Sequence, residues 1–373
     1  MNSFDTVLTQ RVIFGDNSIE KLAESIIALG GSRVLIVTDP GIEEAGILNR
    51  AHAALDNEKI PCYVFSDVDS NPTTKHVDAA VHYAKTHAPI DLIVGLGGGS
   101  AMDTAKGVNF LLTNGGRMED YWGTNRATKP MLPSIGIPTT IGTGSEAQSY
   151  ALISQEDTHI KMACGDKKAQ FRTVVLDPTL TKTLPRDVAA ITGIDAIAHA
   201  VESYVCTRRN PMSQMFSSHA WYLLNEHYES ALEKQNSKAR GKMLFGAYLA
   251  GLAIENSMLG AAHACANPLT AKYGLTHGIA VALMLPHVIR FNRKVVGELY
   301  SEIYPVETIA DRIEQLKRIG ELPNTLQECH VQNSVNSDDI PTLANDAAQQ
   351  WTAQFNPRSL QIHDYIELYK EIF

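Results

Sequence analysis

A chain of 373 residues is too long for a single compact core and predicts two domains, each with its own buried interior. With 44% hydrophobic and 20% charged residues and a net charge of -9, the composition is that of a soluble protein that does not bind nucleic acid. The first residues lack a basic segment followed by a long apolar core, so we expect no targeting peptide and a cytoplasmic location.

Neither a membrane span nor a disulfide framework is predicted. The most apolar stretch, residues 243–266, carries Glu255, Asn256 and His263, which favours a packed interior helix over a bilayer span. The five cysteines are scattered and never form a CxxC pair, which is typical of reduced thiols.

The chain changes character near its middle. Short β-branched runs at residues 34–38, 62–65, 92–95 and 134–138 alternate with amphipathic helical patterns, which predicts βαβ units and a parallel, Rossmann-like sheet. After Pro178 and Pro185, long helical patterns continue to the C-terminus. We therefore expect an α/β dinucleotide-binding domain over residues 1–179, an all-helical metal-binding domain over 180–373, and an active site in the cleft between them.

Asp39 stands at the end of the first predicted strand, in VLIVTD. A carboxylate at the tip of an early strand can accept hydrogen bonds from the ribose hydroxyls of an adenine nucleotide and repels the extra phosphate of NADP. This position favours NAD, although an Asp before Pro40 and Gly41 can also simply form a turn.

The segment VGLGGGSAMDTAK, residues 94–106, has the pattern of a phosphate-binding loop. We predict a strand that ends at Gly95, three glycines (Gly97, Gly98 and Gly99) that permit unusual backbone angles, and a helix that starts at Ser100. The free amides of a helix N-terminus bind phosphate. The segment matches neither GxGxxG nor GxxxxGK[ST], so a plain turn is the alternative.

A second loop, IPTTIGTGSE at residues 137–146, offers hydroxyl groups and free amides. Its side chains Thr139, Thr140 and Thr143 can hold a pyrophosphate or the nicotinamide carboxamide. In isolation the segment is only a polar turn.

Four residues of the second half have spacings suited to one divalent metal. Asp195 and His199 are four residues apart in IDAIAHAVES, which places both on one face of a helix, while His263 and His277 come from two later segments. One carboxylate and three imidazoles suit ferrous iron or zinc. Any one of these histidines alone is more often a core residue bonded to a carbonyl.

Together these segments resemble the group III, iron-containing alcohol dehydrogenase family. Its signatures GGGSxxDxAK, PTTxGTGSE, DAxxHxxE, HAxxxPL and HGxxxxxxLPHV occur in order between residues 1 and 293. The resemblance implies NAD(P)-linked oxidation of an alcohol or reduction of an aldehyde, with a small-molecule substrate and a homodimer, and Asp39 favours NAD. It assigns the metal to Asp195, His199, His263 and His277. It assigns the nucleotide to Asp39, Asn71, Gly97, Gly98, Gly99, Ser100, Asp103, Thr139, Thr140, Thr143 and Lys161.

One position departs from the family pattern. Many members carry a further His four residues after His263, beside the nicotinamide and with a part in proton transfer, whereas this chain has Asn267. An amide cannot relay a proton near neutral pH, so the resemblance implies a hydrogen-bonding role for Asn267 in the catalytic site. Gln148 also stands where Thr is frequent. We expect a more polar pocket and a small polar alcohol or aldehyde, with acid-bearing compounds among the candidates.

Two alternatives remain at this point. A cyclising lyase similar to dehydroquinate synthase also uses NAD and a metal, but it typically needs a Glu, two His and several phosphate-binding Lys and Arg, whereas this chain has Asp195 and few basic residues around its motifs. A catalytically silent protein that binds metal or nucleotide is the other alternative, and Asn267 is its only support.

Overall fold

The computed structural model describes residues 4–87, 89–233, 236–305, 308–331 and 333–373. The chain divides into two compact units: one is Val7–Leu184, and the other combines the residues up to Thr6 with Pro185–Phe373. The predicted boundary at residues 179 and 180 falls inside the short 3-10 helix η5 (Pro178–Thr181), just before the division between the units.

The unit Val7–Leu184 is built on a six-stranded sheet in the order β1-β9-β6-β4-β2-β3, and every pairing in it is parallel. Its strands are β1 (Arg11–Phe14), β2 (Val34–Val37), β3 (Cys62–Phe65), β4 (Leu92–Gly97), β6 (Ser134–Pro138) and β9 (Thr173–Leu176). A smaller sheet has the order β5-β8-β7 and consists of β5 (Gly123–Thr124), β7 (Tyr150–Ser154) and β8 (Lys161–Gly165). The predicted parallel sheet is confirmed, and the four predicted strands are β2, β3, β4 and β6.

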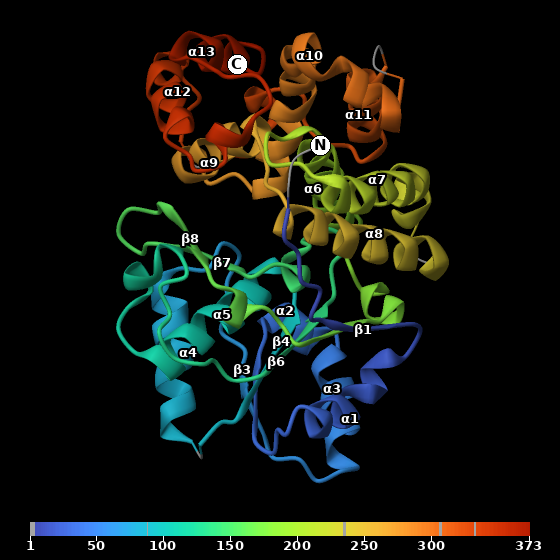
Figure 1. The fold of residues 1–373 in the computed structure, drawn as a ribbon, viewed down its shortest axis with the longest axis vertical. Helices are drawn as coiled ribbons and strands as arrows, with labels where there is room; N and C mark the ends of the chain where they lie inside the picture. The colour runs from blue at the N-terminus through green and yellow to red at the C-terminus, as the bar shows by residue number, and fades with distance from the viewer. Residues whose placement is uncertain (1–3, 88, 234–235, 306–307, 332) are drawn as a thin grey trace. The chain divides into compact units, whose positions relative to one another are not determined.

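Helices cover both faces of the larger sheet, as Figure 1 shows. They are α1 (Leu22–Ala28), α2 (Pro40–Glu44), α3 (Ile47–Asp56), α4 (Thr74–Thr86) and α5 (Gly99–Asn114). Side chains alternate along a strand, so Val34, Ile36 and Val94 lie on one face and join the core under α1 and α3. On the opposite face Gly95 approaches Met102 and Ala105 of α5 closely, because it has no Cβ to hold the helix away.

The second unit is helical. Its helices are α6 (Arg186–Val205), α7 (Pro211–Ala231), α8 (Ser237–Glu255), α9 (Ala261–Tyr273), α10 (His277–Ile303), α11 (Ile309–Ile319), α12 (Ile340–Ala348) and α13 (Ile362–Lys370). Helix α6 packs against α7, α8 and α10, and α9 packs against α10 and α12. The predicted all-helical character of this half is confirmed.

Among the described helices, α6 alone is long and apolar enough to cross a membrane, judged by length and composition. However, 78% of its apolar window is buried inside the molecule, as expected for a core helix. The apolar stretch at 243–266, predicted as an interior helix, is divided between α8 and α9, and almost all of its apolar side chains are buried.

Candidate metal centre and nucleotide loops

Three helices of the second unit bring the predicted metal ligands together. Asp195 and His199 project from one face of α6, His263 is the third residue of α9, and His277 is the first residue of α10. Gly278 permits this arrangement, since a Cβ there would lie 2.5 Å from the carbonyl oxygen of Ile191 on α6. The glycine therefore lets the start of α10 approach the helix that carries Asp195.

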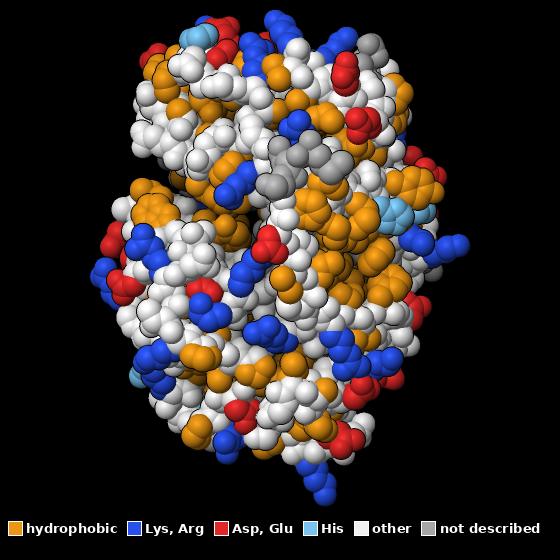
Figure 2. All heavy atoms as spheres, viewed as in Figure 1, with side chains coloured by type: hydrophobic (Ala, Val, Ile, Leu, Met, Phe, Trp, Pro, Cys, Tyr) orange, Lys and Arg blue, Asp and Glu red, His pale blue; other side chains and the backbone are white. Residues whose placement is uncertain are grey.

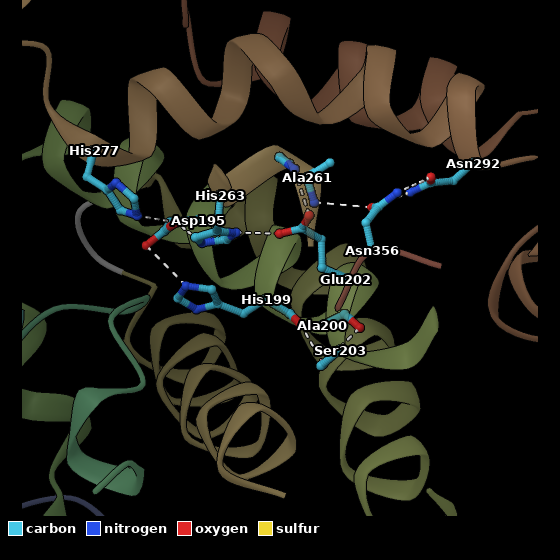
Figure 3. A network of polar contacts seen from close by, with 11 residues as sticks. Asp195, His199, Ala200, Glu202, Ser203, Ala261, His263, His277, Asn292 and Asn356 are labelled. Carbon is cyan, nitrogen blue, oxygen red and sulfur yellow. Dashed lines mark hydrogen bonds and ion pairs between the residues drawn. The ribbon is translucent and has the colours of Figure 1, made fainter. Parts of the chain in front are cut away.

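The four side chains converge on the carboxylate of Asp195, as Figure 3 shows. Its Oδ1 lies 3.4 Å from Nε2 of His263 and 4.0 Å from Nε2 of His277, and its Oδ2 lies 3.6 Å from Nε2 of His199. The rings of His199 and His263 are stacked with their centroids 4.9 Å apart. The ligand atoms of Asp195, His263 and His277 lie within 4.8 Å of one another, whereas His199 contacts the other carboxylate oxygen of Asp195 and lies outside this closest group.

These separations suit a shared divalent ion. Ligand atoms at about 2.1 Å from one metal, in tetrahedral geometry, are about 3.4 Å from each other. In the described part of the chain, Oδ1 of Asp195 and Nε2 of His263 are buried and make no hydrogen bond. Buried polar atoms without hydrogen bonds are costly, so a bound cation is the partner that this geometry lacks.

The protonation states of Asp195 and His199 suit a bound cation, whereas His263, whose pKa is raised to about 9, releases a proton when its Nε2 binds a metal. Burial lowers the pKa of His199 to about 4, so its imidazole is neutral and keeps a free lone pair. Burial opposes ionisation of Asp195 as well, but the imidazoles of His199 and His263 outweigh it and hold the pKa of this carboxyl well below its usual range. The carboxylate therefore brings a full negative charge to the cluster.

Glu202 is a residue of this centre that the predicted site lacks. It lies on α6 and is 4% exposed; its Oε2 forms a short hydrogen bond with Nδ1 of His263, and its Oε1 accepts one from the Ala262 amide at 2.8 Å. Burial lowers the pKa of His263, but Glu202 and Asp195 outweigh it and raise this pKa to about 9. A spacing of i, i+4 and i+7 puts Glu202 on the face of Asp195 and His199, and this was the available signal.

Asn267 lies one turn beyond His263 on α9. Its Nδ2 donates a hydrogen bond to Oε1 of Gln350 at 3.0 Å, which fixes the orientation of the amide. The position one turn from the predicted ligand His263 therefore carries a pair of amides and no titratable group.

In the first unit, several predicted nucleotide contacts lie at the carboxyl edge of the larger sheet. Gly97 ends β4 with a φ of 148°, and a Cβ there would lie 2.9 Å from Oδ2 of Asp39 and 2.8 Å from Cβ of Ala101. Only glycine fits, and the loop therefore approaches Asp39 closely. Asp39 also caps α2 by accepting a hydrogen bond from the Ile42 amide at 3.1 Å, so the predicted alternative role in a turn is present as well.

The boundaries of this loop differ from the prediction. Strand β4 continues to Gly97 instead of ending at Gly95, and α5 begins at Gly99, one residue before Ser100. The glycines belong partly to both elements, because β4 keeps its pairing with β6 up to Gly97 and Pro138. Sequence patterns alone do not reveal how far a glycine run extends a strand.

The threonine loop lies directly against the glycine loop. The Thr139 amide donates to the Gly97 carbonyl at 3.0 Å, and a Cβ on Gly99 would lie 2.6 Å from Oγ1 of Thr143. Oγ1 of Thr140 is buried and has no hydrogen-bond partner among the described residues. Two close loops with free amides and an unused hydroxyl fit the pyrophosphate of a dinucleotide.

The remaining predicted contacts fall into two groups. Asp103 lies on the first turns of α5 with its carboxylate bound to Lys106 and Ser145, so it supports the loops from inside. Asn71 follows β3 with a φ of 56°, and Lys161 begins β8 opposite Ser154. The Ser154 amide in turn donates a hydrogen bond to the Pro72 carbonyl oxygen at 2.9 Å, which places Lys161 near the loop that contains Asn71.

A helical unit with a centre for a divalent metal and an α/β unit with dinucleotide loops define the class of metal-dependent, nucleotide-linked oxidoreductases. Comparison with known proteins specifies the family. The model of iron-containing alcohol dehydrogenases matches residues 9–178, and the C-terminal model of the same family matches residues 189–373. The chain therefore belongs to the iron-containing alcohol dehydrogenase family.

Individual relatives agree with this result. The chain is 34% identical to alcohol dehydrogenase 4 of Saccharomyces cerevisiae, over 96% of both chains. It is similar to the crystal structure of a 1,3-propanediol oxidoreductase (TM-score 0.94, 29% identity, 100% of both chains). It is also similar to sulfoacetaldehyde reductase of Bifidobacterium kashiwanohense in complex with NAD+ (TM-score 0.90, 26% identity, 100% of this chain and 99% of that one).

The predicted family and reaction class are thus confirmed. The protein is an NAD-dependent, metal-dependent alcohol dehydrogenase or aldehyde reductase that acts on a small molecule, and its family uses iron. These matches favour this activity over a cyclising lyase on the same scaffold.

Proposed function

We propose that this enzyme interconverts a small polar primary alcohol and its aldehyde, with NAD(H) as cofactor and with ferrous iron or zinc held by Asp195, His199, His263 and His277. The observation that carries the proposal is the approach of three imidazole Nε2 atoms to within 4.0 Å of a single carboxylate. When bound there, the ion supplies Lewis acidity that polarises the substrate oxygen.

The residues of the chain then have separate tasks. Asp195 supplies the negative charge of the centre, and the neutral imidazole of His199 supplies a lone pair without adding charge. Glu202 accepts the Nδ1 proton of His263 and so directs Nε2 toward Asp195. These contacts set the orientation of the ligands before any substrate binds.

We also propose that the cofactor is NAD and not its 2'-phosphorylated form. The carboxylate of Asp39 lies against the glycine loop just after β2, where it can accept hydrogen bonds from the ribose hydroxyls. The same negative charge repels a phosphate on the ribose.

Proton transfer cannot pass through Asn267, because its amide has no titratable proton near neutral pH. In the direction of aldehyde reduction we therefore assign the proton to solvent or to a ribose hydroxyl of the cofactor. The bond from Asn267 to Gln350 at 3.0 Å holds the amide in place and leaves its carbonyl oxygen as an acceptor. This acceptor favours a substrate with a hydroxyl or another donor near the reacting carbon.

The test begins with metal analysis of the purified protein, followed by the absorbance of NADH in the presence of an aldehyde panel. Propanal, a hydroxyaldehyde and a carboxyl-bearing aldehyde of similar length are compared under the same conditions. We expect NADH consumption that stops after chelation, and faster turnover of the hydroxyaldehyde, whose hydroxyl group can donate to Asn267, than of propanal. Equal rates for propanal and its polar analogues would contradict the polar substrate, and no NADH consumption with a loaded metal would favour a silent binding protein.

For the assembly, we propose a homodimer in the cytoplasm. Strand β1 forms an edge of the larger sheet and exposes Val12 and Phe14, a surface that a second copy of the chain can cover. All five cysteines are free thiols, as expected in a reducing compartment. Acidic and basic side chains are interspersed over the visible face in Figure 2.

Light scattering during gel filtration tests the proposed dimer, and the mass of a monomer would exclude it.

A further inference from the structure

Lys106 is a cation buried inside the first unit, on α5, and it is 1% exposed. Its Nζ donates to Oδ1 of Asp103 at 3.2 Å, to Oγ of Ser145 at 2.7 Å and to the carbonyl of Tyr150 at 2.5 Å. Ser145 Oγ donates in turn to the same Asp103 oxygen at 2.5 Å. An ammonium group has three protons, so these three acceptors use all of them and none remains for a ligand.

Two of the partners of Lys106, Asp103 and Ser145, adjoin the two loops that we propose hold the nucleotide. Asp103 lies three residues after Ser100, in the first turns of α5, and Ser145 lies two residues after Thr143. At the front, the two loops touch through the Thr139 amide and the Gly97 carbonyl. The hydrogen bonds of Lys106 and Asp103 with Ser145 form a second connection between the glycine loop and the threonine loop. This buried connection fixes the distance between the two loops.

The charges around Lys106 make this connection hard to replace. Asp103 is 8% exposed, and Lys106 is the cation that balances its charge at 3.2 Å. Glu146 follows Ser145, is 1% exposed, and has no hydrogen-bond partner for either carboxylate oxygen among the described residues. Burial raises the pKa of Glu146 to about 7. Without Lys106, the charge of Asp103 would be left uncompensated behind loops that bind a pyrophosphate dianion.

We propose that Lys106 is a positioning residue for the cofactor: through Asp103 and Ser145 it sets the spacing of the glycine and threonine loops without touching the nucleotide. Hydrogen bonds from two loops to one pyrophosphate require a fixed separation, because their energy depends steeply on distance and angle. This inference rests on the proposed nucleotide site.

The test compares Lys106→Met, Ser145→Ala and the double variant with the unchanged protein, by NADH fluorescence titration after removal of metal with a chelator. We expect the Kd for NADH to rise about tenfold to a hundredfold in Lys106→Met and about threefold to tenfold in Ser145→Ala. The double variant should lose no more affinity than Lys106→Met, because both changes break one connection. Lys168→Met is the matched control, since Lys168 also pairs with a buried aspartate, Asp166, at 2.8 Å.

Steady-state kinetics of the metal-loaded variants distinguish positioning from general stability. A positioning role raises KM for NADH and leaves kcat at saturating NADH and KM for the aldehyde within about twofold of the unchanged protein. A merely structural role lowers the melting temperature with no change in Kd, and this result in folded variants would overturn the inference. If Lys106→Met does not fold, Ser145→Ala decides alone, and an unchanged Kd would overturn the inference. If the unchanged protein itself fails to bind NADH, the proposed function fails first.

Discussion

Glu202 and His263 form a buried hydrogen bond that joins α6 to the start of α9, with the Oε2 atom of the carboxylate on Nδ1 of the imidazole. The second oxygen of Glu202 accepts a hydrogen bond from the Ala262 amide at 2.8 Å. The carboxylate is therefore hydrogen-bonded to both the backbone and the imidazole ring of the first turn of α9. A ring held in this way keeps its proton on Nδ1 and presents Nε2 to Asp195. The orientation of this predicted ligand thus depends on a residue outside the predicted ligand set.

The first prediction concerns Glu202→Gln. An amide can accept one of these two hydrogen bonds but carries no charge, so the ring of His263 becomes less basic and less fixed. We expect metal affinity to fall about tenfold to a hundredfold, and turnover to fall with it. Competition with a fluorescent chelator measures the affinity. Glu302→Gln is the control, because Glu302, on α10, also accepts a hydrogen bond from a residue of α6, Tyr204, but not from a predicted metal ligand. Equal affinity in the two variants would show that Glu202 does not position the ligand.

The second prediction is that His263→Ala abolishes metal binding and turnover while nucleotide affinity stays within about twofold, since His263 lies in the helical unit and the nucleotide loops in the other. Metal content of the purified variant and NADH titration give the two readouts. His287→Ala is the control: His287 lies 3.7 Å from Glu371 and belongs to no ligand cluster in the described residues. Retained turnover in His263→Ala would remove this residue from the metal centre.

Local patterns predicted the features that depend on neighbours in the sequence. The spacing of Asp195 and His199 gave their shared helix face, and the glycine run gave a tight turn before a helix. The roles of Asp195 and His199 in metal binding, and of the glycine loop in nucleotide binding, stay predictions that the proposed experiments test. Strands β1 and β9 were not predicted individually, because β1 is a four-residue edge strand with a mixed pattern and its partner is far away in the sequence.

The supporting contacts were unpredictable for a similar reason. Glu202 reaches a ring 61 residues away, and Ser145 reaches a carboxylate 42 residues away. The helical period placed Glu202 on the face of Asp195 and His199, but it did not identify His263 as its partner, because that contact forms only when α6 and α9 pack together. A motif therefore predicts the groups that touch a ligand better than it predicts the groups that hold them in place.

The third prediction concerns cofactor choice at Asp39. Asp39→Gly removes both the carboxylate and the cap of α2, whereas Asp39→Asn removes the charge and keeps an acceptor for the Ile42 amide. We expect both variants to gain on the order of tenfold in kcat/KM for NADPH relative to NADH, because the repulsion of the 2'-phosphate is lost. Only the glycine variant should lose stability, by a few tenths of a kcal/mol, about the cost of a Gly cap. An unchanged cofactor ratio in both variants would place the ribose elsewhere.

The last prediction is a pH dependence of stability that originates at Glu146. Its carboxyl group is 1% exposed, and burial raises its pKa from 4.5 to about 7 in the folded protein. Between these two values the unfolded chain loses the proton while the folded protein keeps it. The free energy of unfolding therefore falls as pH rises from 4.5 to about 7, by on the order of 3 kcal/mol, and this contribution is constant above that range.

Glu146→Gln keeps the shape of the side chain and removes the titration. The difference in melting temperature between this variant and the unchanged protein should be more favourable to the variant at pH 8 than at pH 5. Differential scanning calorimetry at both pH values measures it, and Glu43→Gln, at an exposed position on α2, is the control with no pH-dependent difference. An equal difference at pH 5 and pH 8 for Glu146→Gln would mean that the buried carboxyl ionises as readily in the folded protein as in the unfolded chain. In that case the cation of Lys106 would have to balance two negative charges, those of Asp103 and Glu146, behind the nucleotide loops.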